Sequence, residues 1–333
     1  MIEKREIYLK LAEKLHYPPS EYLLRILEKM VTEEEGILLL ELPGEPRDLA
    51  KKVNFDEEEV KKKLREFLER GVVVSTKKGP RLAREVTQLH DASLASSDKY
   101  IDQELLDLWK EFYEREWCQA LAEQWKTLKH PMCAVIPAWE SVQEISQVPS
   151  SDMLPEENMK EIIKGAECIA VVPCSCRRSL QRCDAPLDVC MQFNKWAEYA
   201  VDRGAGRMVS VEEALAINDS VEERGLVHVQ PRVTPDLAVI CNCCPDCCAL
   251  LDPCLKYGGM DKALEKSRYR ASIDQYFCTD CGDCVEKCPF GAVEMRDAST
   301  GDEPKPVIEL EKCFGCGVCV VGCPSEALTM RLV

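Results

Sequence analysis

The sequence predicts a multidomain α+β protein, and three observations support this prediction. Apolar residues recur at helical spacing through the first 130 residues. From 132 to 270, short β-like runs alternate with helical patterns, and two similar cysteine repeats follow them. A chain of 333 residues is long enough for two or three domains, each with its own core. The expected segments are 1–90, 91–131, 132–270 and 271–333.

The first segment is expected to be helical and to end in two short strands. Helices are predicted over 20–31, 46–53 and 56–70, and the strands turn at Gly79–Pro80. Asp56 and Glu59 stand at capping-box spacing, and Gly71 ends the third helix. This order of elements resembles a winged helix, which implies a docking or DNA-binding domain in 1–90.

Charge argues against DNA as the partner of this winged-helix-like domain. The third helix would present its first turn to base edges, and that turn carries four carboxylates, at 56–59. Lysines at 61–63, 77 and 78 could still contact a phosphate backbone. The chain has 43 basic and 59 acidic residues, a net charge of −16, which disfavours nucleic acid and anionic membranes. We therefore expect a docking domain, with a DNA-reading redox regulator as an alternative.

The second and third segments combine helices with short strands. Residues 91–131 form a helical linker with an apolar stripe from Ile101 to Trp125, which we expect to be core. Two β-like runs of the third segment lead directly into cysteine clusters. The expected strands are 133–136, 168–172, 226–229 and 237–240, and the expected helices are 155–164 and 211–224.

Cysteine usage points to metal. No apolar run approaches the roughly 18 residues of a membrane-spanning helix, and the first residues show no export signal. A cytoplasmic location is therefore expected. Reduced thiols in that compartment are ligands more often than disulfide partners, and the chain has 21 cysteines.

The last segment carries two runs with the spacing C-x₂-C-x₂-C-x₃-C-P. In this pattern three close thiolates bind one [4Fe–4S] cluster, and the fourth, before the proline, reaches the other cluster. Zinc is disfavoured because its sites need two pairs of ligands. The predicted iron ligands are Cys278, Cys281, Cys284 and Cys323 for cluster A, and Cys313, Cys316, Cys319 and Cys288 for cluster B.

Residues 272–333 resemble the dicluster bacterial ferredoxin family through these runs. The resemblance implies a pseudo-twofold β–α–β repeat with low-potential one-electron centres. Gly282, Gly315 and Gly317 are expected to keep the loops compact, so that backbone amides approach the inorganic sulfides. The predicted inter-repeat loop is 293–310, with the turn ASTGDEPKP.

A second set of cysteines fills the third segment, and such clustering is typical of ligands and not of packing. It resembles cysteine-rich modules of ferredoxin-like proteins from strict anaerobes. Eight thiolates suit two further [4Fe–4S] clusters, and one cluster plus zinc is the alternative; spacing does not decide the partition. Cys244 and Cys254 are expected to be spares, and Cys118, Cys133 and Cys168 to be core. The predicted ligands are Cys174, Cys176, Cys183, Cys190, Cys241, Cys243, Cys247 and Cys248.

The leading functional hypothesis is an electron-transfer subunit of a larger anaerobic oxidoreductase complex, with no catalytic residue of its own. No Walker loop or flavin fingerprint is present, so electrons are expected to come from a protein partner. Residues 272–333 hold 11 acidic and 5 basic side chains, which favours a partner with a basic face. The alternative is an enzyme with an open-site cluster in the third segment.

Overall fold

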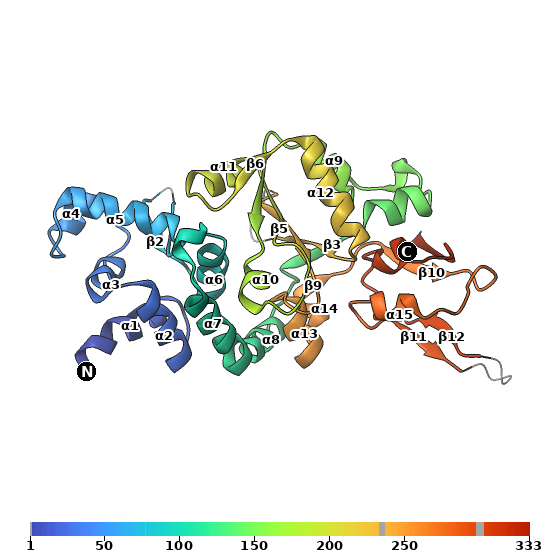
Figure 1. Ribbon diagram of the computed structural model, residues 1–333, viewed down its shortest axis with the longest axis horizontal. Coiled ribbons are helices and arrows are strands. Elements are labelled where there is room, and N and C mark those ends of the chain that lie inside the picture. Colours follow the sequence, from blue (N-terminus) through green and yellow to red (C-terminus); the bar gives the residue numbers. More distant parts are fainter. Residues whose placement is uncertain (1, 77, 233–236, 298–302) are drawn as a thin grey trace. The chain divides into compact units, whose positions relative to one another are not determined.

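The computed structural model describes residues 2–76, 78–232, 237–297 and 303–333 (Figure 1). The chain divides into two compact units. The first unit comprises Met1–Cys118, Val172–Gln181 and Tyr199–Arg207, and the second comprises Gln119–Val171, Arg182–Glu198 and Met208–Val333. Within the described residues, every helix is too short or too polar to cross a bilayer.

The first unit begins with helices that cap their own ends. Asp56 accepts a hydrogen bond from the Glu59 backbone N–H (2.8 Å), as its spacing predicts. Thr32 and Glu35 form a full capping box on a helix that the sequence pattern does not predict. The elements are α1 Ile2–Lys14, α2 Glu21–Met30, α3 Glu33–Leu40, α4 Pro46–Ala50, α5 Glu57–Glu69, the antiparallel pair β1 Val73–Val74 and β2 Arg81–Leu82, and α6 Val86–Leu94.

An aromatic cluster forms the core of the rest of the first unit. Trp109 and Phe112 are fully buried, and Trp117 stacks on Phe112 with a centroid distance of 5.6 Å. The buried ring of His90 lies edge-on to Trp109 at 5.1 Å, so His90 belongs to this core. The elements here are η1 Asp98–Tyr100, α7 Gln103–Phe112, the π-helical turn η2 Tyr113–Trp117 and α10 Ser175–Leu180. Helix α8 Cys118–Lys126 belongs to the second unit from its second residue on, and α11 Lys195–Asp202 is divided between the two units.

A seven-stranded mixed sheet organises the second unit, in the order β6-β4-β5-β8-β7-β3-β9. The strands are β3 Cys133–Ile136, β4 Ile169–Pro173, β5 Asp188–Phe193, β6 Arg207–Val209, β7 Val227–Pro231, β8 Val239–Cys243 and β9 Leu264–Glu265. Of these, β3, β4, β7 and β8 lie within three residues of the predicted runs.

The two faces of the sheet have different neighbours. One face, with Ile136 and Ile240, packs on helices α9 and α12. The other face, with Val135 and Cys243, packs on α13 and on the buried Phe314. The helical elements of this part are η3 Glu140–Ile145, η4 Ser150–Asp152, η5 Pro155–Glu157, α9 Met159–Lys164, α12 Val211–Glu223, α13 Leu251–Tyr257 and α14 Met260–Ala263.

The C-terminal part of the second unit consists of two strand–helix–strand repeats. The outer strands of the repeats pair with each other, β10 with β13, and the inner strands pair as β11 with β12. Residues 298–302, the centre of the predicted inter-repeat turn, lie outside the described residues. The repeats are β10 Tyr269–Ile273, α15 Asp283–Lys287 and β11 Val293–Arg296, then β12 Lys305–Ile308, α16 Val318–Val321 and β13 Leu328–Leu332.

A buried group of hydrogen-bonded polar side chains joins the sheet to α12. The Glu222 carboxylate, 2% exposed, accepts hydrogen bonds from the backbone N–H groups of Trp139 (2.9 Å) and Glu140 (3.0 Å). It also accepts from His228 Nε2 (3.1 Å), while His228 Nδ1 faces Asn242 Oδ1 at 2.6 Å. Both ring nitrogens of His228 are therefore within hydrogen-bond distance of a buried polar partner. Burial opposes ionisation of Glu222, but the hydrogen bonds outweigh it and lower the pKa of this carboxyl.

Replacing Glu222 by Gln is expected to lower the free energy of unfolding by about 2–3 kcal/mol, because it breaks hydrogen bonds of a buried carboxylate and leaves buried polar groups without a full set of partners. The control is Glu223→Gln, an exposed neighbour on α12. Denaturant midpoints by circular dichroism measure the difference. Since the folded pKa of Glu222 is lowered, its contribution is present at neutral pH and is lost as the pH falls through that pKa. Equal midpoints for both variants at pH 7 would contradict this account.

Candidate metal centres

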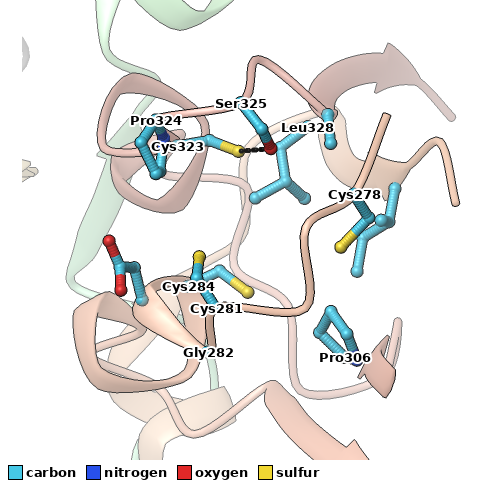
Figure 2. A pocket seen from close by; sticks show the side chains of 12 residues that line it. Cys278, Cys281, Gly282, Cys284, Pro306, Cys323, Pro324, Ser325 and Leu328 are labelled. Carbon is cyan, nitrogen blue, oxygen red and sulfur yellow. Dashed lines mark hydrogen bonds between the residues drawn. The ribbon is translucent and has the colours of Figure 1, made fainter. Parts of the chain in front are cut away.

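Four cysteines from both C-terminal repeats line one pocket near the surface. Figure 2 shows Cys278, Cys281 and Cys284 on one stretch of chain and Cys323 on another, around a shared space. Cys281 is exposed, whereas Cys284 is buried. We call this group the surface pocket. It brings together the residues predicted for cluster A.

The remaining four cysteines of the two runs line a second pocket, which we call the buried pocket. Its residues Cys313, Cys316 and Cys319 are all buried, and Cys288 comes from the first repeat. The backbone N–H of Ala292 donates to Cys288 Sγ at 3.2 Å. The residues predicted for cluster B thus lie around one cavity. The fourth cysteine of each run lines the pocket of the other run.

The thiols of the two pockets differ in how easily they ionise. Burial raises the pKa of Cys316 to about 12 and that of Cys284 to about 11. Burial also opposes ionisation of Cys323, but the Ser325 hydroxyl and three backbone N–H groups donate to its sulfur and lower its pKa. N–H···S bonds of this kind are what tunes an iron–sulfur centre. The sulfur sets and these donors fit thiolate ligation of a [4Fe–4S] cluster in each pocket.

Comparison with known protein families decides the nature of this region. Residues 277–327 match the family model of the 4Fe-4S dicluster domain. The predicted C-terminal dicluster domain is therefore confirmed, and this region binds 4Fe–4S clusters. The match covers under a fifth of the chain, and no curated protein matches the chain.

The dicluster domain is anchored to the sheet through the loop of the buried pocket. The backbone N–H of Ala138 donates to the Cys316 carbonyl at 2.9 Å, and that of Ser267 donates to the Phe314 carbonyl at 3.1 Å. Phe314 stacks on Phe290 with a centroid distance of 4.5 Å. Phe314 and Cys316 belong to the same apolar cluster as Cys243 of β8. The loop of the buried pocket therefore shares one apolar cluster with cysteines of the middle of the chain.

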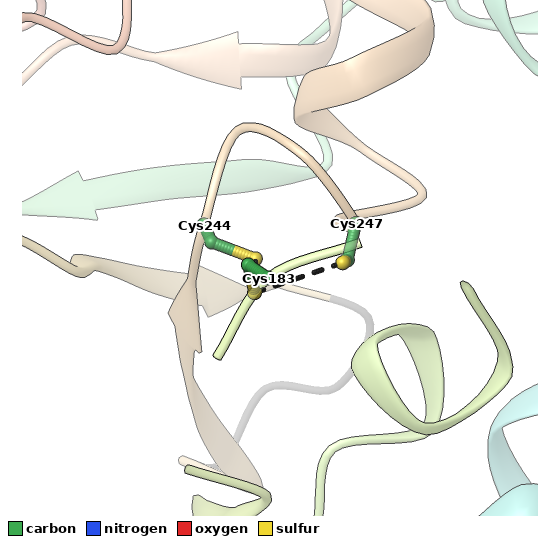
Figure 3. A group of neighbouring side chains, drawn as sticks. All are labelled: Cys183, Cys244 and Cys247. Atoms are coloured by element: carbon green, nitrogen blue, oxygen red, sulfur yellow. Dashed lines mark hydrogen bonds between the residues drawn. The ribbon is translucent and has the colours of Figure 1, made fainter. Parts of the chain in front are cut away.

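One group of middle cysteines lies where β8 ends. Cys183 Sγ is 3.5 Å from Cys244 Sγ and 3.8 Å from Cys247 Sγ, and all three sulfurs lie within 4.8 Å of one another (Figure 3). We call this set the loop thiol group. It includes Cys244, which the sequence analysis treated as a spare. The hydrogen bond between Cys247 and Cys244, together with burial, raises the pKa of the Cys247 thiol.

A second group lies on the sheet and is called the sheet thiol group. Cys243 shares sulfur hydrogen bonds with Cys241 and Cys248, and these bonds together with burial raise its pKa far above the usual value. Met191 pairs with Ile240, so the next residues along, Cys190 and Cys241, are neighbours on the opposite face. Cys190 of β5 therefore stands beside the sheet thiol group, as a candidate fourth ligand.

Two predicted ligands belong to the first unit. Cys174 precedes α10, and Cys176 lies on that helix with its sulfur within 4.8 Å of ligand atoms of His90 and Asp91. The remaining cysteines do not line either pocket. Cys168 Sγ donates to the Asn194 carbonyl at 3.4 Å, and Cys118, Cys133 and Cys254 are buried.

Glycine is required at the buried pocket for packing as well as for backbone conformation. Gly282 and Gly317 precede equivalent helices, with φ values of +81° and +80°. A Cβ on Gly282 meets nothing within 4 Å, whereas one on Gly317 would lie 2.1 Å from Ser141 Oγ. The sequence predicts that these glycines let backbone amides approach the inorganic sulfides. The contact between Gly317 and Ser141 follows only from the fold.

Replacing Gly317 by Ala is therefore expected to destabilise the protein more than the matched change Gly282→Ala. Both substitutions place an alanine in the left-handed backbone conformation, which costs about 1–2 kcal/mol of stability. Only Gly317→Ala also brings the new Cβ into a clash with Ser141, which costs about 1–3 kcal/mol more. Denaturant midpoints and retention of visible cluster absorption measure the difference. Adding Ser141→Gly should restore much of the loss, and equal effects of the two alanines would refute the packing argument.

Crossed ligation predicts which cluster each cysteine variant damages. Cys323→Ser should give the same altered EPR spectrum as Cys281→Ser, because both sulfurs line the surface pocket. Cys288→Ser should instead resemble Cys319→Ser. All four variants are compared in the anaerobically reduced full-length protein. A Cys323→Ser spectrum that matches Cys319→Ser would show that each run binds its own cluster.

Proposed function

We propose that this chain relays single electrons between protein partners, as a subunit of a larger oxidoreductase of anaerobic metabolism. The observation that carries the proposal is the set of thiol groups: a surface pocket, a buried pocket, and a sheet thiol group that shares an apolar cluster with the buried pocket. Bound [4Fe–4S] clusters supply one-electron chemistry. The chain supplies ligation, burial and spacing.

The proposed ligands follow from the sulfur groups. The surface pocket holds one cluster and the buried pocket another, and both pockets share an apolar cluster that includes Cys284 and Cys319. The sheet thiol group with Cys190 holds a third centre. Cys174 and Cys176 remain predicted ligands on the grounds of their spacing. The surface pocket includes the exposed Cys281, whereas three cysteines of the buried pocket and three of the third centre are buried, which limits loss of electrons to solvent.

The surface pocket is the proposed point of contact with a redox partner. Tyr276 and Phe277, beside Cys278, are 88% and 58% exposed, and their rings meet edge-on at 5.1 Å. Exposed aromatic residues of this kind are common anchors of protein interfaces. Residues 272–333, which include both aromatic residues, hold 11 acidic and 5 basic side chains. A partner with a basic face and an apolar centre fits this surface.

The N-terminal winged-helix-like segment is proposed to dock on protein and not on DNA. Lys61 is paired with Glu57 (3.0 Å) and Glu58 (2.8 Å), and Lys63 with Glu35 (2.9 Å). The positive charges of these lysines are therefore neutralised by glutamates of the same segment. The carboxylates in the first turn of α5 still repel phosphate. This charge distribution favours a docking role within an assembly.

The proposal is tested by electron delivery to a small basic haem protein from the reduced full-length chain. Tyr276→Ser with Phe277→Ser should slow the reaction about fivefold or more with cluster content unchanged, because the anchors are lost. Added salt should slow the wild-type reaction, since opposite charges steer the encounter. Tyr257→Ser, at another exposed tyrosine, on α13, is the control. Rates that depend neither on salt nor on the two aromatic residues would contradict the proposed docking surface.

A further inference from the structure

Adjacent cysteines of the middle segment belong to different sulfur groups. Strand β8 ends at Cys243, whose sulfur lies with the sheet thiol group, and the chain then turns away from the strand. Cys244, the residue directly after β8, belongs to the loop thiol group. The next adjacent pair divides in the same way, Cys247 to the loop group and Cys248 to the sheet group. The middle cysteines therefore form two sites.

The sulfur distances in the loop thiol group fit a single metal ion. A tetrahedral ion with metal–sulfur bonds of about 2.3 Å has ligand sulfurs about 3.8 Å apart. The measured separations from Cys183 Sγ are 3.5 Å to Cys244 and 3.8 Å to Cys247. Three thiolates at these distances can share one ion, whereas a [4Fe–4S] cluster takes four cysteines, the number that the sheet thiol group reaches with Cys190.

The loop thiol group is held in place by contacts other than its own sulfurs. The Arg182 guanidinium donates to the Asp246 carbonyl and to the Asp252 carboxylate, each at 3.2 Å. Its backbone N–H also donates to the Cys247 sulfur. Lys256 completes the contact by pairing with Asp252 at 3.0 Å. These bonds fix the segment that carries Cys183 against the turn after β8, and hydrogen bonds of this type orient metal ligands.

We propose that Cys183, Cys244 and Cys247 bind one Zn²⁺ ion at three of its four tetrahedral positions. Sulfur-rich tetrahedral coordination is typical of structural zinc. The ion is redox-inert, and it joins the loop before β5 to the end of β8. It thereby fixes the strands that carry Cys190 and the sheet thiol group. The site is separate from the proposed electron path and does not depend on it.

The test is metal analysis of the full-length chain purified without oxygen. The wild type should hold about one zinc, with iron from the clusters. Cys183→Ser and Cys244→Ser should each lose the zinc and keep the iron, and the double variant should lose no more than either. Cys243→Ser should lose iron and keep the zinc. Cys168→Ser, which keeps its hydrogen bond to Asn194, is the control for an unrelated thiol.

A second measurement needs no variant. Zinc X-ray absorption of the wild type should show at least three sulfurs at about 2.3 Å. Fewer than three sulfurs, absence of zinc, or loss of iron from Cys244→Ser would overturn the site. EPR signals of the dicluster domain in the same samples report separately on the electron-transfer proposal, so the two can fail independently.

Discussion

The constraint on which the structure depends is that thiols must be held together although ionised sulfurs repel one another. Burial raises the pKa of Cys316 to about 12 and that of Cys284 to about 11, so neither ionises readily alone at neutral pH. A bound cationic centre reverses this preference, because metal ligation favours the thiolate. The surrounding fold must therefore fix the sulfurs in position, and the metal centres in turn stabilise the fold.

The two faces of the sheet in the second unit have different roles in holding the thiols. One face packs on α9 and α12, where the Glu222–His228 pair ties the helix to the strands. The other face carries the sheet thiol group and receives Phe314 of the buried pocket. The dicluster domain is thus part of the core of its unit, because its loop shares backbone hydrogen bonds with Ala138 and Ser267. This packing fixes the dicluster domain to the sheet that carries the middle cysteines.

The sequence predicts what depends on local spacing and misses what depends on where strands end. The C-x₂-C-x₂-C-x₃-C-P runs indicate both four-cysteine pockets, because chain geometry over ten residues is nearly fixed by that spacing. The division of Cys243 from Cys244 follows from the end of β8, which no pattern marks. Strand β5, with Cys190, was missed because its short run lacks a clear β signal. His228 looks isolated in the sequence, since its partners Glu222 and Asn242 lie on other elements.

The most direct test of the account is magnetic coupling between the dicluster domain and the middle of the chain. In the fully reduced full-length protein, pulsed EPR should detect a third paramagnetic centre coupled to the cluster of the buried pocket. In Cys243→Ser that coupling should disappear, while the coupling between the two clusters of the dicluster domain remains. Spectra of the wild type and Cys243→Ser that are identical, with only two coupled centres in each, would contradict the account.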